Sequence, residues 1–140
     1  MPGNPKGDRR ERELARMLSD DGCFPMRAPA SGSSTERDLP DVHVGQNGFS
    51  VAIEAKSSSG DPIYIGEEEL EALDSFAFAF GSIPLVGVRF DREDWYFFLP
   101  EDLYRTHSGN GRVKKKTAIE DGMSYDELLR TLLNGDNIAP

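Results

Sequence analysis

Residues 49–56, FSVAIEAK, restrict the fold of this chain more than any other stretch, because apolar and other side chains alternate there as in a β-strand. The apolar residues hold the odd-numbered positions. Glu54 and Lys56 are two apart, so their side chains leave the same face of that strand. An Asn-Gly turn signal at 46–48 follows a short apolar segment at 41–44. The sequence therefore predicts a β-hairpin with a charged pair on one face.

The charged residues of this hairpin suggest a metal site. Asp41 begins the first strand, and Glu54 lies on the second, so the two acids can reach one hard cation that prefers oxygen ligands. Lys56 adds a positive charge beside them, and burial can lower the pKa of such a lysine until it acts as a base. Glu11, on a predicted helix, can complete the site directly or through a water. We therefore predict Glu11, Asp41 and Glu54 as metal ligands.

Each of these residues also has a simpler interpretation. Glu11 follows Asp8 by three residues, the spacing of a capping box at a helix start. Glu54 and Lys56 can form an ordinary exposed pair on a solvated strand face. Asp41 can be a plain turn residue. Spacing alone leaves these alternatives open.

The rest of the chain predicts one mixed α/β domain over residues 1–140, with a central sheet flanked by helices. Expected helices cover residues 8–20, 67–80 and 124–133, and Gly81 should end the second one. Expected strands cover 23–27, 41–44, 49–56, 83–90 and 95–99, with a further short one at 63–65. We expect residues 1–7 to form a flexible tail, 28–40 a mobile active-site loop and 105–122 no regular structure.

Composition indicates the cellular location of the protein. It also raises one objection to a DNA-binding role. Cys23 is the only cysteine, and no long apolar run exists, so we expect a cytoplasmic protein with no membrane contact. The formal net charge is −9, whereas a phosphate-binding face should be basic. An acidic surface is typical of a protein that stays soluble in high salt, which predicts a halophilic source. Acidic residues concentrate at 67–74, and basic ones at 6–16 and 112–116.

Pro40-Asp41 followed by Glu54-Ala55-Lys56 resembles the PD-(D/E)xK signature of a large nuclease superfamily that includes restriction enzymes. A longer, collinear match is more specific. KGDRRERE, RAPASGS, LPDVHVGQNGFSVAIEAKS, IYIGEEEL, FAFGSIPLVGVRF and RTHSGNG are together similar to archaeal Holliday junction resolvases. This resemblance favours a metal site over the simpler interpretations.

The resemblance implies a restriction-endonuclease-like fold with a roughly five-stranded sheet, and a homodimer that nicks four-way DNA junctions with Mg²⁺ or Mn²⁺. It implies catalytic roles for Glu11, Ser31, Asp41, Glu54 and Lys56. Phe76 and Phe80 match family aromatics that pack or form the dimer contact. A sliding clamp is a candidate recruiting partner.

Residues expected to contact DNA come partly from this resemblance, which points to Arg12 and Arg27, and partly from the distribution of basic residues. The full set is Lys6, Arg9, Arg10, Arg12, Arg27, Arg37, Lys114, Lys115 and Lys116. Two rival functions stay open: another restriction-like or repair endonuclease of the same superfamily, and a non-catalytic DNA-binding module. Two acids beside phosphate repel DNA unless a cation neutralises them, which argues against the binding module.

Overall fold

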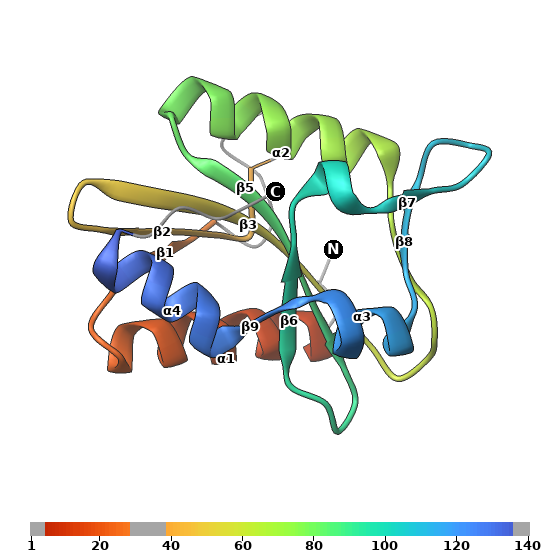
Figure 1. The fold of residues 1–140 in the computed structure, drawn as a ribbon, viewed down its shortest axis with the longest axis horizontal. Helices are drawn as coiled ribbons and strands as arrows, with labels where there is room; N and C mark the ends of the chain where they lie inside the picture. Colours follow the sequence, from red (N-terminus) through yellow and green to blue (C-terminus); the bar gives the residue numbers. More distant parts are fainter. Residues whose placement is uncertain (1–4, 29–38, 136–140) are drawn as a thin grey trace.

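A mixed β-sheet forms the centre of the computed structural model, which describes residues 5–28 and 39–135 (Figure 1). The strands lie in the order β1-β2-β3-β5-β6-β9. Their bounds are β1 Phe24–Arg27, β2 Val42–Gln46, β3 Phe49–Ser58, β5 Ile83–Phe90, β6 Trp95–Phe98 and β9 Met123–Ser124. Neighbouring strands are antiparallel except β3 and β5, which are parallel. The predicted mixed α/β sheet is confirmed, with six strands instead of about five.

The hairpin of β2 and β3 forms where the sequence predicted it. Asn47 and Gly48 connect the two strands with φ angles of 56° and 76°. Positive φ angles at two consecutive residues give a two-residue turn the twist that matches its flanking antiparallel strands. Asparagine and glycine adopt positive φ angles at low energetic cost. The register pairs Val42 with Ile53. Asp41, just before β2, therefore lies beside Glu54.

Helices cover both faces of the sheet and enclose two apolar clusters (Figure 1). Their bounds are α1 Pro5–Asp20, α2 Glu67–Phe80, α3 Lys115–Asp121 and α4 Tyr125–Asn134. Ala52 of β3 packs in the cluster that includes Leu70 and Leu73 of α2. Val51 and Ile53 pack in the other, with residues of α1 and α4. The predicted alternation is thus confirmed, and Glu54 and Lys56 share the α2 side with Ala52. No helix within the described ranges is long and apolar enough to cross a membrane.

Two of the predicted helix boundaries are confirmed by their caps. The residue after α2, Gly81, has a φ of 70°, and its backbone N–H reaches the last carbonyls of the helix. Before α4, the Ser124 hydroxyl accepts a hydrogen bond from the backbone N–H of Glu127, whose side chain accepts one from Ser124 in return. Helix α2 therefore ends where local sequence indicated, and α4 begins directly after the predicted capping residue.

The first helix begins earlier than predicted. Helix α1 starts at Pro5, so residues 5–7 are helical and do not belong to a tail. Proline suits the first turn of a helix, because its missing N–H would have no intrahelical partner there. Asp8 consequently lies inside α1 and cannot form the proposed capping box with Glu11. Its carboxylate instead pairs with Arg12 and Arg27.

The expectation of no regular structure over 105–122 is wrong. Strands β4 (Ile63–Ile65), β7 (Tyr104–Arg105) and β8 (Gly111–Val113) form a second, three-stranded sheet in the order β4-β8-β7. A short 3-10 helix, η1 (Pro100–Asp102), precedes it, and α3 follows it. These elements are too short to show periodicity, and β8 depends on a partner distant in sequence. Burial of Val113 and Ala118 in the α2-side cluster holds them in place.

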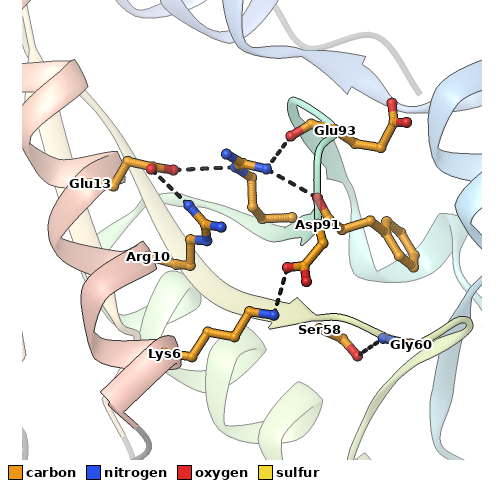
Figure 2. A network of polar contacts seen from close by, with 9 residues as sticks. Lys6, Arg10, Glu13, Ser58, Gly60, Asp91 and Glu93 are labelled. Carbon is orange, nitrogen blue, oxygen red and sulfur yellow. Dashed lines mark hydrogen bonds and ion pairs between the residues drawn. The ribbon is translucent and has the colours of Figure 1, made fainter.

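A half-buried carboxylate attaches α1 to strands β5 and β6 of the sheet. Glu13 accepts hydrogen bonds from Trp95 Nε1 at 3.1 Å and from Arg89 Nε at 3.3 Å. These partners come from β6 and β5. The contact draws the charged side of α1 against the sheet and sets the orientation of the helix that carries Glu11. Figure 2 shows Glu13 between α1 and this part of the sheet.

Candidate active site

Asp41 and Glu54 meet at the junction of β2 and β3. Asp41 Oδ2 accepts a hydrogen bond from the backbone N–H of Ala55 at 2.8 Å. Both acids line a cavity of about 220 Å³ that is also lined by Leu39, Pro40 and Glu69, among others. The Glu54 side chain is only 12% exposed. The structure thus brings together two of the three predicted metal ligands.

Lys56 lies on the same face, between two carboxylates. Its Nζ is 2.5 Å from Glu69 Oε2 and 3.9 Å from Glu54 Oε2. Glu69 comes from the first turn of α2, so the lysine connects the sheet to the helix above it. The predicted charged pair of Glu54 and Lys56 is therefore part of a three-residue cluster, in which the shorter contact of the lysine is with Glu69.

Burial and mutual repulsion disfavour negative charge on the carboxylates at this site. Burial, followed by the charge of Asp41, raises the pKa of Glu54 to about 9. Burial also raises the pKa of Asp41, against the opposing effect of the Ala55 N–H. The pKa of Glu11 rises to about 7, first through burial and then through Asp41. Without a cation, simultaneous ionisation of these three acids at neutral pH is therefore unfavourable.

The pKa of Lys56 moves in the opposite direction from the sequence-based expectation. Burial lowers it, but the hydrogen bond and charge of Glu69, with the charges of Glu54 and Asp41, more than offset this effect. The net result is a raised pKa, so Lys56 is a cation in this state. Its surroundings suit electrostatic stabilisation of a phosphate better than general-base action.

Glu11 approaches the site from α1. Its carboxylate is 3.7 Å from Arg27 Nη2, and its pKa responds to the charge of Asp41. Arg27 also donates to Asp8 Oδ1 at 2.6 Å. The arginine at the end of β1 therefore connects α1 to the catalytic side of the sheet, with its charge directed at two acids.

Several of the basic residues predicted to contact DNA are engaged inside the chain. Lys6 Nζ lies 2.6 Å from Asp91, and Arg10 is 3.0 Å from Glu13, as Figure 2 shows. Arg12 pairs with Asp8. Exposed basic side chains of the predicted set include Arg9, Arg12, Lys114 and Lys116. Ser31, Arg37 and most of the predicted 28–40 loop lie outside the described residues.

Sequence reasoning missed Glu69. This residue belongs to the acidic run at 67–74, to which the sequence alone assigned no role at the site. The usable signal was its position: it is the third residue of a helix that begins shortly after the strand with Glu54 and Lys56. An acid in a helix's first turn is common for electrostatic reasons, so its contact with Lys56 could not be inferred from sequence.

The donor set at this cavity suits a hard divalent cation. Asp41 and Glu54 offer carboxylate oxygens, the ligand type that Mg²⁺ and Mn²⁺ prefer. Burial and mutual repulsion raise the pKa of both acids, and a bound cation would relieve that repulsion. Across residues 5–28 and 39–135, no cluster of three or more His, Cys, Asp or Glu side chains is arranged to hold a metal.

An apolar cavity adjoins the charged one. It measures about 760 Å³ and shares Leu39, Pro40 and Ala72 with the smaller cavity. Phe76 and Phe80 stack in its wall with ring centroids 4.5 Å apart. Phe80 is 63% exposed, and Met26 and Phe24 of β1 are 72% and 76% exposed. An apolar surface of this kind on a small domain indicates a contact site for another macromolecule.

Asp41 and Glu54 line one cavity, and Lys56 lies beside Glu54, on a mixed sheet flanked by helices. This combination defines the class of metal-dependent nucleases with the PD-(D/E)xK motif. Residues 3–135 match the family described as archaeal Holliday junction resolvase (Hjc), and the chain belongs to that family.

Individual relatives agree with this assignment. The crossover junction endodeoxyribonuclease Hjc of Sulfolobus acidocaldarius is 37% identical over 131 residues, which cover 93% of this chain and 90% of the relative. The crossover junction endodeoxyribonuclease Hje of Saccharolobus islandicus is 30% identical over 121 residues, 82% of this chain and 84% of the relative. The crystal structure of the Archaeoglobus fulgidus Holliday junction resolvase Hjc matches with a TM-score of 0.78 and 29% identity, covering 88% of this chain and 99% of that one.

Proposed function

We propose that this chain is a structure-selective, metal-dependent endodeoxyribonuclease that resolves four-way DNA junctions by paired, symmetric nicks during recombination and repair. The observation that carries the proposal is the meeting of Asp41 and Glu54 at one cavity, with Lys56 Nζ 3.9 Å from Glu54, in a member of the archaeal Holliday junction resolvase family. The relatives named above are called crossover junction endodeoxyribonucleases, and they support the same activity.

The acids would hold the cation. Asp41 and Glu54 are the proposed direct ligands of Mg²⁺ or Mn²⁺, with the Ala55 carbonyl as a further candidate. Glu11 would bind directly or through a water. Held by these residues, a divalent cation would make a water molecule more acidic and would offset negative charge on the phosphate. The Asp41 hydrogen bond to Ala55 fixes one ligand relative to the other strand, so the chain presents the two carboxylates together.

Lys56 would act on the phosphate as a cation. Its raised pKa keeps the ammonium charged, and its Nζ lies 3.9 Å from Glu54, one of the proposed metal ligands. A fixed positive charge that is already in place when negative charge develops stabilises the transition state without reorganisation. Ser31 is the proposed assisting hydroxyl, carried over from the family.

Two copies of the chain would pair through the apolar surface formed by Phe24, Met26, Phe76 and Phe80. A symmetric dimer needs a self-complementary patch, and the exposed Phe80 ring stacked on half-buried Phe76 provides one. Met26, Phe76 and Phe80 line the apolar cavity, which shares Leu39, Pro40 and Ala72 with the smaller, charged cavity. Pairing would therefore set the distance between two active sites, which is how a shape-selective enzyme can cut two strands symmetrically.

The proposed DNA contacts are phosphate contacts that fix orientation and do not read sequence. They would come from the basic residues named above, including Arg37 and Lys114 to Lys116. Residues Lys6, Arg10, Arg12 and Arg27 would have to exchange their internal partners for phosphate. Recruitment by a sliding clamp stays a prediction.

The decisive experiment compares cleavage of a labelled four-way junction with that of a matched linear duplex, with Mg²⁺ at low and at molar salt. Wild type is compared with Glu54→Ala. Paired nicks in the junction alone, lost in the variant while junction binding survives, are the expected result. Equal cutting of the duplex would indicate a general nuclease. Absence of metal-dependent cutting at every salt concentration would refute the catalytic proposal and leave a binding module.

A further inference from the structure

Glu69 uses its two carboxylate oxygens for two different purposes. Oε1 accepts the backbone N–H of Gly66 at 2.9 Å, at the start of α2. Oε2 is 2.5 Å from Lys56 Nζ. The side chain is 36% exposed and lines the cavity that Asp41 and Glu54 also line. One residue of α2 thus connects the helix start to the catalytic lysine.

The helix start does not require the negative charge of Glu69. A capping box needs one side-chain oxygen at the third helical position, and glutamine provides it as well as glutamate. Glu67 and Glu68 already place negative charge in the first turn, where it favours the helix dipole. The charge of Glu69 is therefore available for another role, and the group that it faces is Lys56.

Lys56 needs a partner that fixes its position. A lysine side chain is a long, flexible stem, and its ammonium adopts one location only when a contact restrains it. Glu54 lies 3.9 Å away, beyond hydrogen-bonding distance, whereas Glu69 lies within it. Because the backbone N–H of Gly66 anchors Glu69, the restraint on the lysine is itself fixed to the fold.

We propose that Glu69 is a positioning residue for the nuclease reaction, which holds the Lys56 ammonium beside Glu54, on the face of β3 that carries the proposed metal ligand. This inference rests on the proposed function, since it assigns Lys56 a role at the phosphate. Glu69 acts through Lys56 and does not itself contact substrate. Loss of its charge leaves the lysine free to move and slows cleavage without weakening DNA binding.

The test separates the charge of Glu69 from its capping role. Glu69→Gln keeps the acceptor for Gly66 and removes the charge that pairs with Lys56. Glu69→Ala removes both. Glu68→Gln is the matched control, because this exposed neighbour in the same helical turn undergoes the same change of charge. Each variant is compared with wild type in three measurements: single-turnover junction cleavage with Mg²⁺, junction affinity without metal, and thermal unfolding.

We expect Glu69→Gln to unfold at the wild-type temperature, to bind the junction at least as tightly, and to cleave about 10- to 100-fold more slowly, the usual cost of losing an orienting partner. Glu69→Ala should cleave as slowly and also unfold at a lower temperature. Glu68→Gln should cleave at the wild-type rate.

Wild-type cleavage by Glu69→Gln, with slow cleavage confined to Glu69→Ala, would overturn the inference and leave Glu69 as a helix cap. Equal slowing by Glu68→Gln would also overturn it, because net charge would then explain the effect. Failure of the proposed function is distinct from both, since wild type itself would not cut the junction.

Discussion

The Asp41 carboxylate accepts a hydrogen bond of 2.8 Å from the backbone N–H of Ala55. This bond joins the first acid of the motif to the residue that lies between Glu54 and Lys56. The motif is therefore held by a contact between strands as well as by spacing along the chain. Neutralising Asp41 and shortening it should have different consequences.

Asp41→Asn keeps an oxygen for Ala55 but loses the charge needed for a cation. We expect this variant to fold and to cleave junctions at least about a hundredfold more slowly than wild type. Loss of a side chain that supports a metal ligand can already slow a reaction about a hundredfold, and loss of the ligand's own charge should cost no less. Asp41→Ala leaves the Ala55 N–H without its acceptor, a loss of about 1–3 kcal/mol for a buried donor. Thermal unfolding without metal should place Asp41→Ala below Asp41→Asn, and the opposite order would contradict this role of the hydrogen bond.

Glu54→Gln should stabilise the metal-free protein at neutral pH. The pKa of Glu54 is raised from 4.5 to about 9, so the folded state binds a proton that the unfolded state has released. Its favourable contribution is fully present below pH 4.5 and is lost as pH rises towards 9. A neutral glutamine at this position causes no such loss of stability at high pH. We therefore expect the unfolding temperature of Glu54→Gln to exceed that of wild type by about 3 °C or more near pH 8.

Added metal should reverse the order of the unfolding temperatures of wild type and Glu54→Gln. Added Mg²⁺ binds the folded wild type and raises its unfolding temperature, whereas Glu54→Gln should respond much less. Calorimetry with and without Mg²⁺ checks both statements. An equal response of the two proteins would show that Glu54 is not a ligand.

Phe80→Asp should convert a dimer to a monomer. The Phe80 ring is 63% exposed and lies in the wall of the apolar cavity, where a carboxylate would be buried without a partner on pairing. Phe78→Asp is the control, since Phe78 is on the same helix, is 91% exposed and does not line that cavity. Sedimentation velocity should give a monomer only for Phe80→Asp. A dimeric Phe80→Asp protein would place the interface elsewhere.

Acid should destabilise the chain through His43. This ring bonds to the Ser82 hydroxyl at 2.9 Å and packs edge-on against Phe76 and Phe80, and burial lowers its pKa below 6.5. The neutral ring contributes stability that is complete above pH 6.5 and declines as pH falls below it. His43→Gln lacks this decline.

Unfolding temperatures measured at about pH 7.5 and pH 5.5 should therefore show wild type losing on the order of 1–2 °C more than His43→Gln, within the range that a single shifted histidine can produce. Parallel losses in the two proteins would assign the acid sensitivity to other groups.

Local signals in the sequence predicted much of the fold. The Asn47-Gly48 turn, the Gly81 cap and the Ser124 capping box each depend on neighbours a few residues away, and all three are confirmed. The strand with Glu54 and Lys56 could be predicted because the alternation of apolar and polar side chains depends only on which face of the strand is buried. The start of α1 was misjudged because Asp8 resembles a cap, although its carboxylate pairs with Arg12 and Arg27 instead.

Contacts between distant segments could not be predicted. Strand β8 is three residues long and depends on β4, so nothing within 105–122 indicates it. The same limit applies to the site: Asp41, Glu54 and Lys56 were found through their spacing, whereas Glu69 meets Lys56 only because α2 folds back over the sheet. Basic residues of α1 suggested a free phosphate-binding surface, because composition does not reveal that Lys6 and Arg10 face Asp91 and Glu13.

The parallel pairing of β3 with β5 determines which part of the charged cluster depends on topology. Parallel neighbours need a crossover, and α2, which carries Glu69, lies within the crossover from β3 to β5. Asp41 comes beside Glu54 through the hairpin of β2 and β3, which needs only local contacts. The contact of Lys56 with Glu69 instead requires this crossover to pack over the sheet. Changes in the connection between β3 and β5 should therefore disturb the lysine before they disturb the two acids.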